Sequence, residues 1–502
     1  MAKFAVAGPH LAVLLVVLRV AGAAPADASS EASLDLDYYD DDLFVPPTNE
    51  GNFDVFDWQL CKHMAHEETG NMVVSPVSIK LLLAMLYEGA AGNTALQLGQ
   101  ALNLPQRLES RKKFTAVLDS LLTKKPEYLL HVGTRMYVRK DVTTRPRFSK
   151  ILQSFYNASI HNIDFQESSK AVETVNSWVS EITNGKIKTM FSADTVNPST
   201  VLLLVNAIYF KGLWRYPFNE SYTRPGKFQV TPSQSVTVPY MTMERDLYWT
   251  ESVELESSIL RLPYMGNKYS MFIVLPNKPD GLNKLVNTAS PALLRNQLFH
   301  MVKGKVGVRL PKFSFDFTAR LENSLQALGI RDIFNDSAAN LPGMTREKSL
   351  YVSKAIQKAG LEVNERGTTA FASTGIQLDD RFGSEVTFHA THPFMFFIQD
   401  ETMGTVIFVG KLTNPNTEPG SLRNPDDRPR VTDNVSGQGL LESRLGAENS
   451  RQQVPDKPQL TTPRSPKRTF NPISSNTIEG LIPHKVWAYI SEHMFKLQRN
   501  VQ

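Results

Sequence analysis

The chain has 502 residues, enough for one large domain or for two to three domains of average size. Its formal net charge of +4 at pH 7 is small for this length, so bulk charge does not indicate a nucleic-acid-binding protein. The charge is unevenly distributed, because residues 24–61 hold ten Asp or Glu and no Lys or Arg. This asymmetry is more informative than the total.

The first 23 residues have the pattern of a secretory signal peptide. Lys3 precedes the apolar run Leu11–Leu18, and Ala21-Gly-Ala23 is a small-residue cleavage site. The apolar run is too short to span a bilayer, which takes about 20 apolar residues. The alternative is a buried core helix. We expect a secreted, extracellular protein without a membrane span.

Composition divides the rest of the chain into three zones. Residues 24–51 are acidic and poor in core-forming residues, which predicts a disordered tail. Residues 52–414 have globular composition. Residues 415–502 are rich in Pro, Arg, Asn and Ser, which predicts a mostly disordered extension. Apolar spacing near residues 484–497 of that extension indicates a short helix.

The globular zone mixes helical and strand-like patterns without regular alternation, which predicts an α+β fold. Ser75 followed by Pro76 is a good helix start, with Ser as the N-cap and Pro at the first helical position. We expect helices at residues 53–66, 76–89, 172–183 and 321–328. We expect strands at 201–209, 270–275 and 305–311, and a hairpin of 394–398 with 405–409.

Cys61 is the only cysteine, so no intrachain disulfide can form and Cys-based zinc motifs are excluded. It follows an apolar run, which indicates a buried small hydrophobe; the alternative is a thiol available for intermolecular pairing. His389 and His392 have no partner at metal-like spacing, so we expect them to flank a strand. We expect no metal and no required cofactor. Four glycosylation sequons start at Asn157, Asn219, Asn335 and Asn434.

Arg381 is the only Lys or Arg between Arg366 and Lys411. The segment before it, residues 368–380, has no proline, so every backbone N–H there can join a sheet. Because side chains alternate along a strand, one face is uncharged, small at first and apolar later. Glycines at 367, 375 and 383 favour a flexible loop instead. A segment that suits both a loop and a sheet strand indicates a conformational switch between the two. The uncharged face holds Thr368, Ala370, Ala372, Thr374, Ile376 and Leu378.

Glu362-Val-Asn-Glu-Arg-Gly-Thr-Thr-Ala370 resembles the hinge of the serpins, serine protease inhibitors that trap a protease by inserting a loop into a sheet. Other strings resemble serpin motifs in the same order, and the match covers roughly residues 52–414. The hinge and closing strands look similar to those of extracellular arthropod serpins. The further strings are residues 71–79, 88–94, 176–179, 183–187, 206–214, 392–398 and 408–411.

The resemblance implies a serpin fold of three β-sheets surrounded by about eight to nine helices, with an exposed reactive loop. It implies no catalytic residues, and the sequence offers no nucleophile, base and orienting group of a hydrolase. Counting sixteen residues from the hinge Glu365 places the reactive bond at Arg381–Phe382. The implied hinge and insertion residues are Glu365, Gly367, Thr368, Ala370, Ala372 and Thr374, and the implied shutter residues are Ser75, Ser78, Asn206 and Gln357. Gln357 stands where many members carry a histidine, and glutamine can also bridge strands.

The implied function is suicide-substrate inhibition of a trypsin-like serine protease by a monomeric chain, with no nucleic-acid or membrane partner. By analogy with arthropod serpins, this suggests control of a clotting, melanisation or immune cascade. The alternatives are a non-inhibitory carrier, chaperone or signalling protein, and an interaction protein that uses its C-terminal extension. Non-inhibitory members often carry Pro or large charged residues in the hinge, unlike this chain.

Two charged segments resemble regions that tune other serpins. Tyr38 and Tyr39 lie among carboxylates, as in tyrosine-sulfated tails that contact a basic protease exosite; the alternative is a merely solvating tail. A basic cluster lies where some members bind heparin-like glycosaminoglycan, although such a cluster can also be an ordinary solvated face. The cluster comprises Arg111, Lys112, Lys113, Lys124 and Lys125, with Arg107 nearby.

Overall fold

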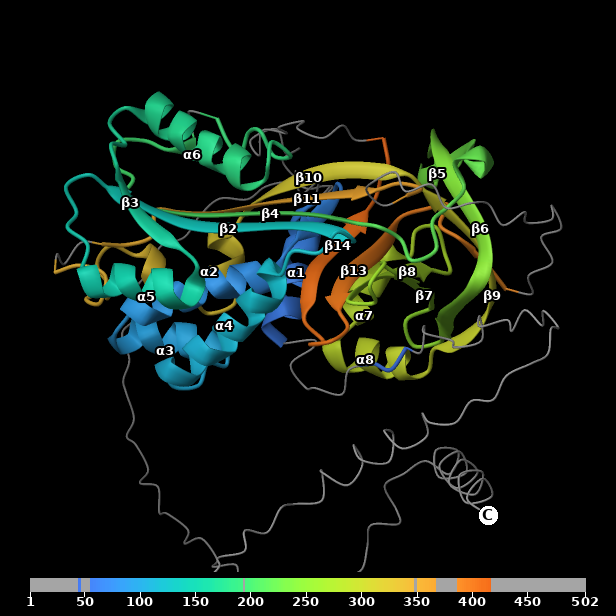
Figure 1. Cartoon of the computed structure of the whole chain (residues 1–502), viewed down its shortest axis with the longest axis horizontal. Helices are drawn as coiled ribbons and strands as arrows, with labels where there is room; N and C mark the ends of the chain where they lie inside the picture. Colours follow the sequence, from blue (N-terminus) through green and yellow to red (C-terminus); the bar gives the residue numbers. More distant parts are fainter. Residues whose placement is uncertain (1–43, 47–54, 193–194, 347–349, 367–385, 417–502) are drawn as a thin grey trace, which may run out of the picture. The chain divides into compact units, whose positions relative to one another are not determined.

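The computed structural model describes residues 44–46, 55–192, 195–346, 350–366 and 386–416 (Figure 1). The chain divides into two compact units, Met1–Arg428 and Pro429–Gln502, and every described residue belongs to the first. Several predicted features lie outside the described residues. They are the signal peptide, Tyr38, Tyr39, the segment from Gly367 through the Arg381–Phe382 bond, Asn434 and the short C-terminal helix.

The described residues form helices α1 to α9, which confirms the four predicted helices to within a few residues at each end. α2 begins at Pro76 and ends at Gly89, as predicted. Gly329 follows α9 with φ +91°, a left-handed conformation that glycine adopts without strain and that ends a helix. The bounds are α1 Val55–Glu67, α2 Pro76–Gly89, α3 Gly92–Ala101, α4 Arg107–Leu122, α5 Pro146–Tyr156, α6 Ser168–Ile182, α7 Leu282–Thr288, α8 Pro291–Phe299 and α9 Glu322–Ala327.

A five-stranded sheet has the order β10-β11-β4-β2-β3. β11 and β4 are parallel and pair from Lys354 opposite Leu203 to Leu361 opposite Phe210. β10 pairs antiparallel with β11, and β2 antiparallel with β4. The parallel pair of β11 and β4 therefore lies in the middle of the sheet. The bounds are β2 Tyr128–Arg139, β3 Ser159–Ile163, β4 Leu202–Gly212, β10 Phe313–Arg320 and β11 Lys354–Val363.

A nine-stranded sheet has the order β1-β14-β13-β8-β7-β6-β9-β12, with β5 also paired to β6. The hairpin predicted near the end of the core is the antiparallel pair β13–β14. We expected three sheets, but the described strands form two hydrogen-bonded networks. The reason is that β6 is 19 residues long and pairs with β5 and β9 over most of its length and with β7 at its end, so it joins two sheets into one. The bounds are β1 Met72–Val74, β5 Arg224–Thr231, β6 Gln234–Ser252, β7 Ser257–Pro263, β8 Tyr269–Pro276, β9 Val302–Pro311, β12 Val386–His389, β13 Phe394–Asp400 and β14 Val406–Leu412.

Helices cover both faces of the five-stranded sheet, with α6 on one face and α2 on the other (Figure 1). α2 is buried nearly all round, which its mostly apolar sequence requires. Trp178 and Val179 of α6 belong to a separate hydrophobic cluster with residues of β2, β4 and β11. Cys61 in α1 is buried, as predicted, and burial followed by the charge of Asp57 raises the pKa of its thiol.

Two local expectations do not hold. The predicted disordered tail includes Phe44, whose side chain is only 6% exposed and packs on Tyr248 and Phe272. Phe44 lies between Leu43 and Val45, so a short apolar run marks this contact within an acidic segment. Ser75 occupies the N-cap position of α2, but its hydroxyl makes no capping hydrogen bond, and Gln357 accepts from its backbone N–H.

Candidate functional site

Glu365 lies at the base of the predicted hinge, two residues before the segment that the structure does not describe. Its Oε1 accepts a hydrogen bond from Thr223 Oγ1 at 2.9 Å, and its Oε2 lies 2.9 Å from Lys312 Nζ. Burial would raise the pKa of this carboxyl, but the hydrogen bonds from Lys312 and Thr223 outweigh it and lower the pKa. Glu365 is therefore held as a buried, paired carboxylate.

The backbone on either side of Glu365 is also fixed. Trp214 Nε1 donates to the carbonyl of Asn364 at 2.8 Å, and the N–H of Phe218 donates to the carbonyl of Glu365 at 2.9 Å. Arg366 forms a 2.7 Å ion pair with Glu220 in the short 3-10 helix Glu220–Tyr222. The hinge thus starts from a rigid base in which the chain ahead of Gly367 is anchored.

The four predicted shutter residues meet in one buried cluster, with each residue 0% exposed. Gln357 Oε1 accepts from Ser75 N at 2.8 Å, and Gln357 Nε2 lies within hydrogen-bond distance of Ser78 Oγ and Asn206 Oδ1, both at 2.8 Å. Ser78 Oγ also donates to Asn206 Oδ1 at 2.7 Å. The cluster ties the start of α2 to β11 and β4, the two parallel strands at the middle of the sheet.

Glutamine can serve at position 357 because its side-chain amide accepts at one atom and donates at the other. Gln357 pairs directly with Asn206 across β11 and β4. Asn206 continues the network by donating to Thr134 Oγ1 in β2 at 2.9 Å. The expectation that glutamine can bridge the strands is confirmed.

A second connection crosses β4 and β11 near the hinge. Glu362 of β11 accepts from Lys211 Nζ at 2.7 Å and from Tyr209 Oη at 3.2 Å, and both donors belong to β4. Burial and the neighbouring Glu362 raise the pKa of Tyr209, so its hydroxyl stays protonated and donates. Any separation of the two strands must break these contacts.

On the face of the sheet that α6 covers, Lys358 connects β11 to β10 and to the segment after α6. Lys358 is 2% exposed, and its Nζ donates to the carbonyl of Thr189 at 2.8 Å and lies 3.1 Å from Asp316 Oδ1. Asn176 of α6 accepts from the N–H of Met190 at 2.8 Å. The segment after α6 is therefore fastened to the helix on one side and to β11 on the other.

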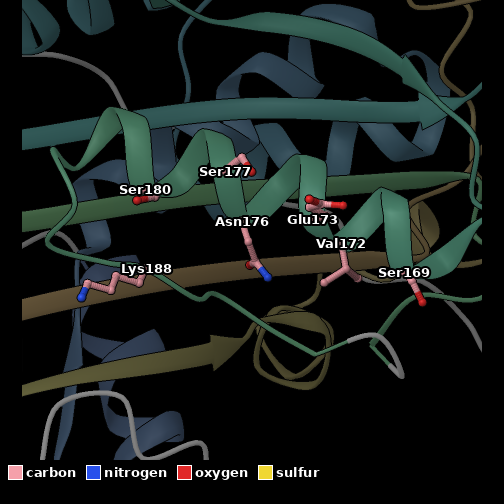
Figure 2. A pocket seen from close by; sticks show the side chains of 7 residues that line it. All are labelled: Ser169, Val172, Glu173, Asn176, Ser177, Ser180 and Lys188. Carbon is pink, nitrogen blue, oxygen red and sulfur yellow. The ribbon is translucent and has the colours of Figure 1, made fainter.

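A pocket of about 620 Å³ lies along α6 and this following segment. Figure 2 shows Asn176 directed from the helix toward the segment that carries Lys188. One carboxylate, Glu173, and one cation, Lys188, stand among mostly small polar side chains. The lining residues are Ser169, Val172, Glu173, Asn176, Ser177, Ser180 and Lys188.

The basic cluster on α4 is not uniform. Arg111 forms a bidentate pair with Glu88 of α2, at 2.9 and 2.6 Å, and the Glu88 side chain is fully buried. Arg107 donates to the carbonyls of Tyr87 and Ala90, also at the end of α2. These two arginines therefore hold α4 on α2. The exposed cations are Lys112, Lys113, Lys124 and Lys125.

The three described sequon residues, Asn157, Asn219 and Asn335, are exposed. His389 ends β12 and His392 is buried just before β13. Within the described ranges, no three His, Cys, Asp or Glu side chains gather as a metal site. The same ranges contain no helix that is both long and apolar enough to cross a membrane.

Sequence reasoning named Glu365 but not its partners. Lys312 precedes it by 53 residues and Thr223 by 142, and neither stands in a distinctive motif. Lys358 gave one usable signal, because a lysine in the middle of a buried central strand needs a buried partner. Its partners, Thr189 and Asp316, lie on other elements and follow only from the fold.

A family model described as Serpin (serine protease inhibitor) matches residues 52–415. "Serine protease inhibitor 2" of Anopheles gambiae is 35% identical over 373 residues, which cover 72% of this chain and 91% of the relative. The structure of Manduca sexta serpin-12 is similar, with a TM-score of 0.66 and 28% sequence identity. The match covers 72% of this chain and 98% of the serpin-12 chain. The structure of human thyroxine-binding globulin complexed with thyroxine is also similar, with a TM-score of 0.68 and 27% sequence identity. That match covers 73% of this chain and 98% of the globulin chain.

Proposed function

The chain belongs to the serpin family of serine protease inhibitors, and on that premise we propose that it is a suicide-substrate inhibitor of a trypsin-like serine protease. The observation that carries the proposal is the anchored base at Glu365, set at the end of β11 beside the parallel strand β4. A segment that follows this base can fold back and enter the sheet between the two strands.

The proposed sequence of events starts with cleavage. The serine of the protease attacks the carbonyl carbon of Arg381, the bond to the nitrogen of Phe382 breaks, and the protease remains as an acyl-enzyme. The freed residues 368–380 then enter the sheet with their small and apolar face inward. Thirteen residues at about 3.3 Å each carry the tethered protease roughly 40 Å. Distortion of the protease at the end of this movement stops hydrolysis of the ester.

The residues around the bond define the protease class. An arginine side chain fits a specificity pocket that carries a carboxylate, through a charge-assisted bidentate contact. Asp379 and Asp380 precede Arg381 and repel proteases with acidic neighbouring subsites. We therefore propose a target with an acidic primary pocket and a basic region next to it.

Incubation with a set of trypsin-like proteases tests the proposal. We expect a covalent complex that survives boiling in detergent, formed by the wild type and abolished by Arg381→Ala. Amino-terminal sequencing of the released peptide should begin at Phe382. Cleavage at Arg381 without any stable complex would show that the chain is a substrate and would refute the inhibitor proposal.

The similarity to thyroxine-binding globulin, a structure complexed with thyroxine, supports a second candidate function as a carrier. The small residues Thr368, Ala370 and Ala372 in the hinge favour inhibition over this candidate. The test for a detergent-stable covalent complex distinguishes the inhibitor from the carrier, because a carrier forms no covalent complex with a protease and binds an apolar ligand without being cleaved.

We further propose that the protein is secreted and modified. The exposed positions of Asn157, Asn219 and Asn335 are compatible with glycan attachment, and Asn434, Tyr38 and Tyr39 are sequence-based candidates for glycosylation and sulfation. We propose heparin-like glycosaminoglycan as an optional ligand of the exposed lysines on and after α4. Intact mass before and after glycosidase treatment tests the first proposal, and salt elution from heparin resin tests the second.

A further inference from the structure

The turn that follows α6 contains Asn184-Gly185, the only Asn-Gly pair in the sequence. Both residues are exposed, and both have left-handed backbones, with φ +51° at Asn184 and +72° at Gly185. A carbon atom placed at the Cβ position of Gly185 would meet no other atom within 4 Å. The side chain of Asn184 is therefore followed by a backbone nitrogen in open surroundings.

An asparagine side chain in this setting can react with the next backbone nitrogen. Gly185 N loses its proton and attacks Cγ of Asn184, the bond from Cγ to Nδ2 breaks, and the departing nitrogen takes up a proton and leaves as ammonia. Water then opens the five-membered imide at either of its two carbonyls, which gives aspartate or isoaspartate. Glycine favours ring closure because it has no Cβ to obstruct the approach and adopts the required backbone freely.

The folded turn restrains this reaction. The N–H of Gly185 donates to the carbonyl of Ser180 at 2.7 Å, and the N–H of Asn184 donates to the carbonyl of Glu181 at 3.0 Å. Such backward hydrogen bonds are typical of a helix that ends in a left-handed residue. Since the attacking nitrogen must first lose the proton that the Ser180 carbonyl binds, the closed turn slows the attack.

Thr183 holds the turn closed from the buried side. Its side chain is 0% exposed, and its hydroxyl donates to the carbonyl of Val179 at 2.6 Å and accepts from the N–H of Ile187 at 3.1 Å. The residues before and after the Asn-Gly pair are thus joined through one hydroxyl group. Opening the turn requires that these hydrogen bonds break together.

The end of α3 provides a matched turn without the glycine. Asn103 is exposed and left-handed, with φ +47°, and its N–H donates to the carbonyl of Gln100 at 3.2 Å. The next N–H, that of Leu104, donates to the carbonyl of Gly99 at 2.9 Å, five residues back as in the turn after α6. The two turns share their hydrogen bonds and differ in the residue after the asparagine.

We propose that Asn184 is a deamidation site of this protein, and that the hydrogen-bonded turn after α6 sets the rate of its conversion to aspartate and isoaspartate. The reaction needs only water, and it is slow while the turn is closed and fast when the turn opens. The proposal is independent of the proposed inhibitory function, because it rests on the backbone of the turn alone.

The modification has a structural consequence. In isoaspartate the main chain runs through the side-chain carbon, which lengthens the backbone by one methylene group and shifts Gly185 away from the Ser180 carbonyl. The segment after the turn carries Thr189, whose carbonyl accepts the hydrogen bond of Lys358 in β11. The isoaspartate form should therefore hold the end of α6 and the segment after it less tightly.

The experiment follows deamidation of the full chain in mildly alkaline buffer, folded and in concentrated urea, by peptide mapping that distinguishes aspartate from isoaspartate. The variants are Thr183→Val, the conservative Thr183→Ser, and Asn184→Gln, whose longer side chain cannot form the five-membered ring. Asn103 is measured in the same digests as the internal control. Thermal midpoints verify that each variant is folded during the incubation.

We expect Asn184 in the folded wild type to deamidate on the order of tenfold more slowly than in urea, because several hydrogen bonds must open first. Thr183→Val should raise the rate in the folded state about fivefold, the effect of one hydrogen bond, and Thr183→Ser should match the wild type. Asn103 and the Asn184→Gln variant should stay unmodified.

Hydrogen exchange tests the structural consequence. The isoaspartate form, separated from the unmodified protein by ion exchange, should show faster exchange across residues 183–190. Freshly prepared Asn184→Asp adds the same charge without lengthening the backbone, and it should exchange like the wild type.

Four results would overturn parts of the proposal. Absence of product at Asn184 in the folded chain overturns the site, and equal rates in the folded and urea-unfolded chains overturn control by the turn. A folded Thr183→Val variant with the wild-type rate overturns the role of its hydroxyl. Deamidation of Asn103 as fast as that of Asn184 overturns the role of the glycine.

Discussion

Gln357 in β11 binds both backbone polar groups of Ser75, with Oε1 accepting from the N–H at 2.8 Å and Nε2 donating to the carbonyl at 3.1 Å. The strand is thereby joined to the first turn of α2 through one side chain. This pairing makes Gln357 the centre of the shutter cluster.

Gln357→Ala should leave the N–H of Ser75 without its acceptor and remove one of the two donors to Asn206 Oδ1 in a dry site, at a cost of about 1–3 kcal/mol. We expect a lower urea midpoint and a larger fraction of chain cleaved without complex formation. Gln399→Ala is the matched control, because Gln399 is equally buried but makes one hydrogen bond, to Gly404. Equal losses in the two variants would contradict the special role of the shutter.

Glu365→Gln should remove a charge that the folded protein stabilises. The pKa of Glu365 is lowered in the folded state, so its contribution is present above the unfolded pKa of about 4.3 and is lost as the pH falls below it. The wild type should therefore have the higher thermal midpoint at pH 7, and the difference should close as the pH falls below about 4.3, through the lowered pKa of the folded state. A gap that widens on acidification would contradict this assignment. Glu220→Gln, which breaks an exposed pair with Arg366, should have a smaller effect.

Glu362→Ala should weaken the connection between β4 and β11 at the hinge end. Tyr209 and Lys211 would lose their shared acceptor, so the strands should separate more readily. We expect faster loss of inhibitory activity on mild heating, with new monomeric or oligomeric species in native gels. An activity half-life equal to that of the wild type would show that these contacts do not limit strand separation.

Arg111→Met and Lys112→Met should separate structure from ligand binding on α4. Arg111→Met strands the buried carboxylate of Glu88 with only the Tyr156 hydroxyl, which should cost about 3–5 kcal/mol. Lys112→Met should leave stability unchanged and lower the salt concentration that elutes the protein from heparin resin. Unchanged elution after Lys112, Lys113, Lys124 and Lys125 are all replaced would refute glycosaminoglycan binding there.

Thr374→Arg and Ser373→Arg place the same charge on opposite faces of the insertion segment. Thr374 belongs to the small, uncharged face, so an arginine there should block entry into the sheet and give cleavage without a complex. Ser373 belongs to the other face, and its variant should still form the complex. Identical behaviour of the two variants in the gel assay would exclude a strand-like inserted state.

The sequence predicted those elements whose signals are local. The Pro76 start and Gly89 end of α2, the β13–β14 hairpin and the burial of Cys61 all follow from neighbouring residues, and each is confirmed. The shutter residues were found through the family resemblance, because Ser75 and Gln357 are 282 residues apart. No local pattern connects them.

Other parts of the site could not be predicted, because they depend on contacts between distant elements. Arg111 and Lys112 are neighbours with the same charge, yet only Arg111 faces Glu88 on α2, and this depends on how α4 packs. Phe44 stood out as one of the few apolar residues in the acidic segment 24–51. Nothing in its local sequence showed that its side chain has a specific site on the sheet.

The parallel alignment of β4 and β11 has a consequence for strand direction. A segment that turns back after β11 must run antiparallel to β11, and therefore antiparallel to β4 as well. Its entry would replace one parallel ladder by two antiparallel ladders, whose hydrogen bonds are straighter and slightly more stable per residue. A strand added between β4 and β11 would therefore give both strands an antiparallel partner in place of their present parallel one.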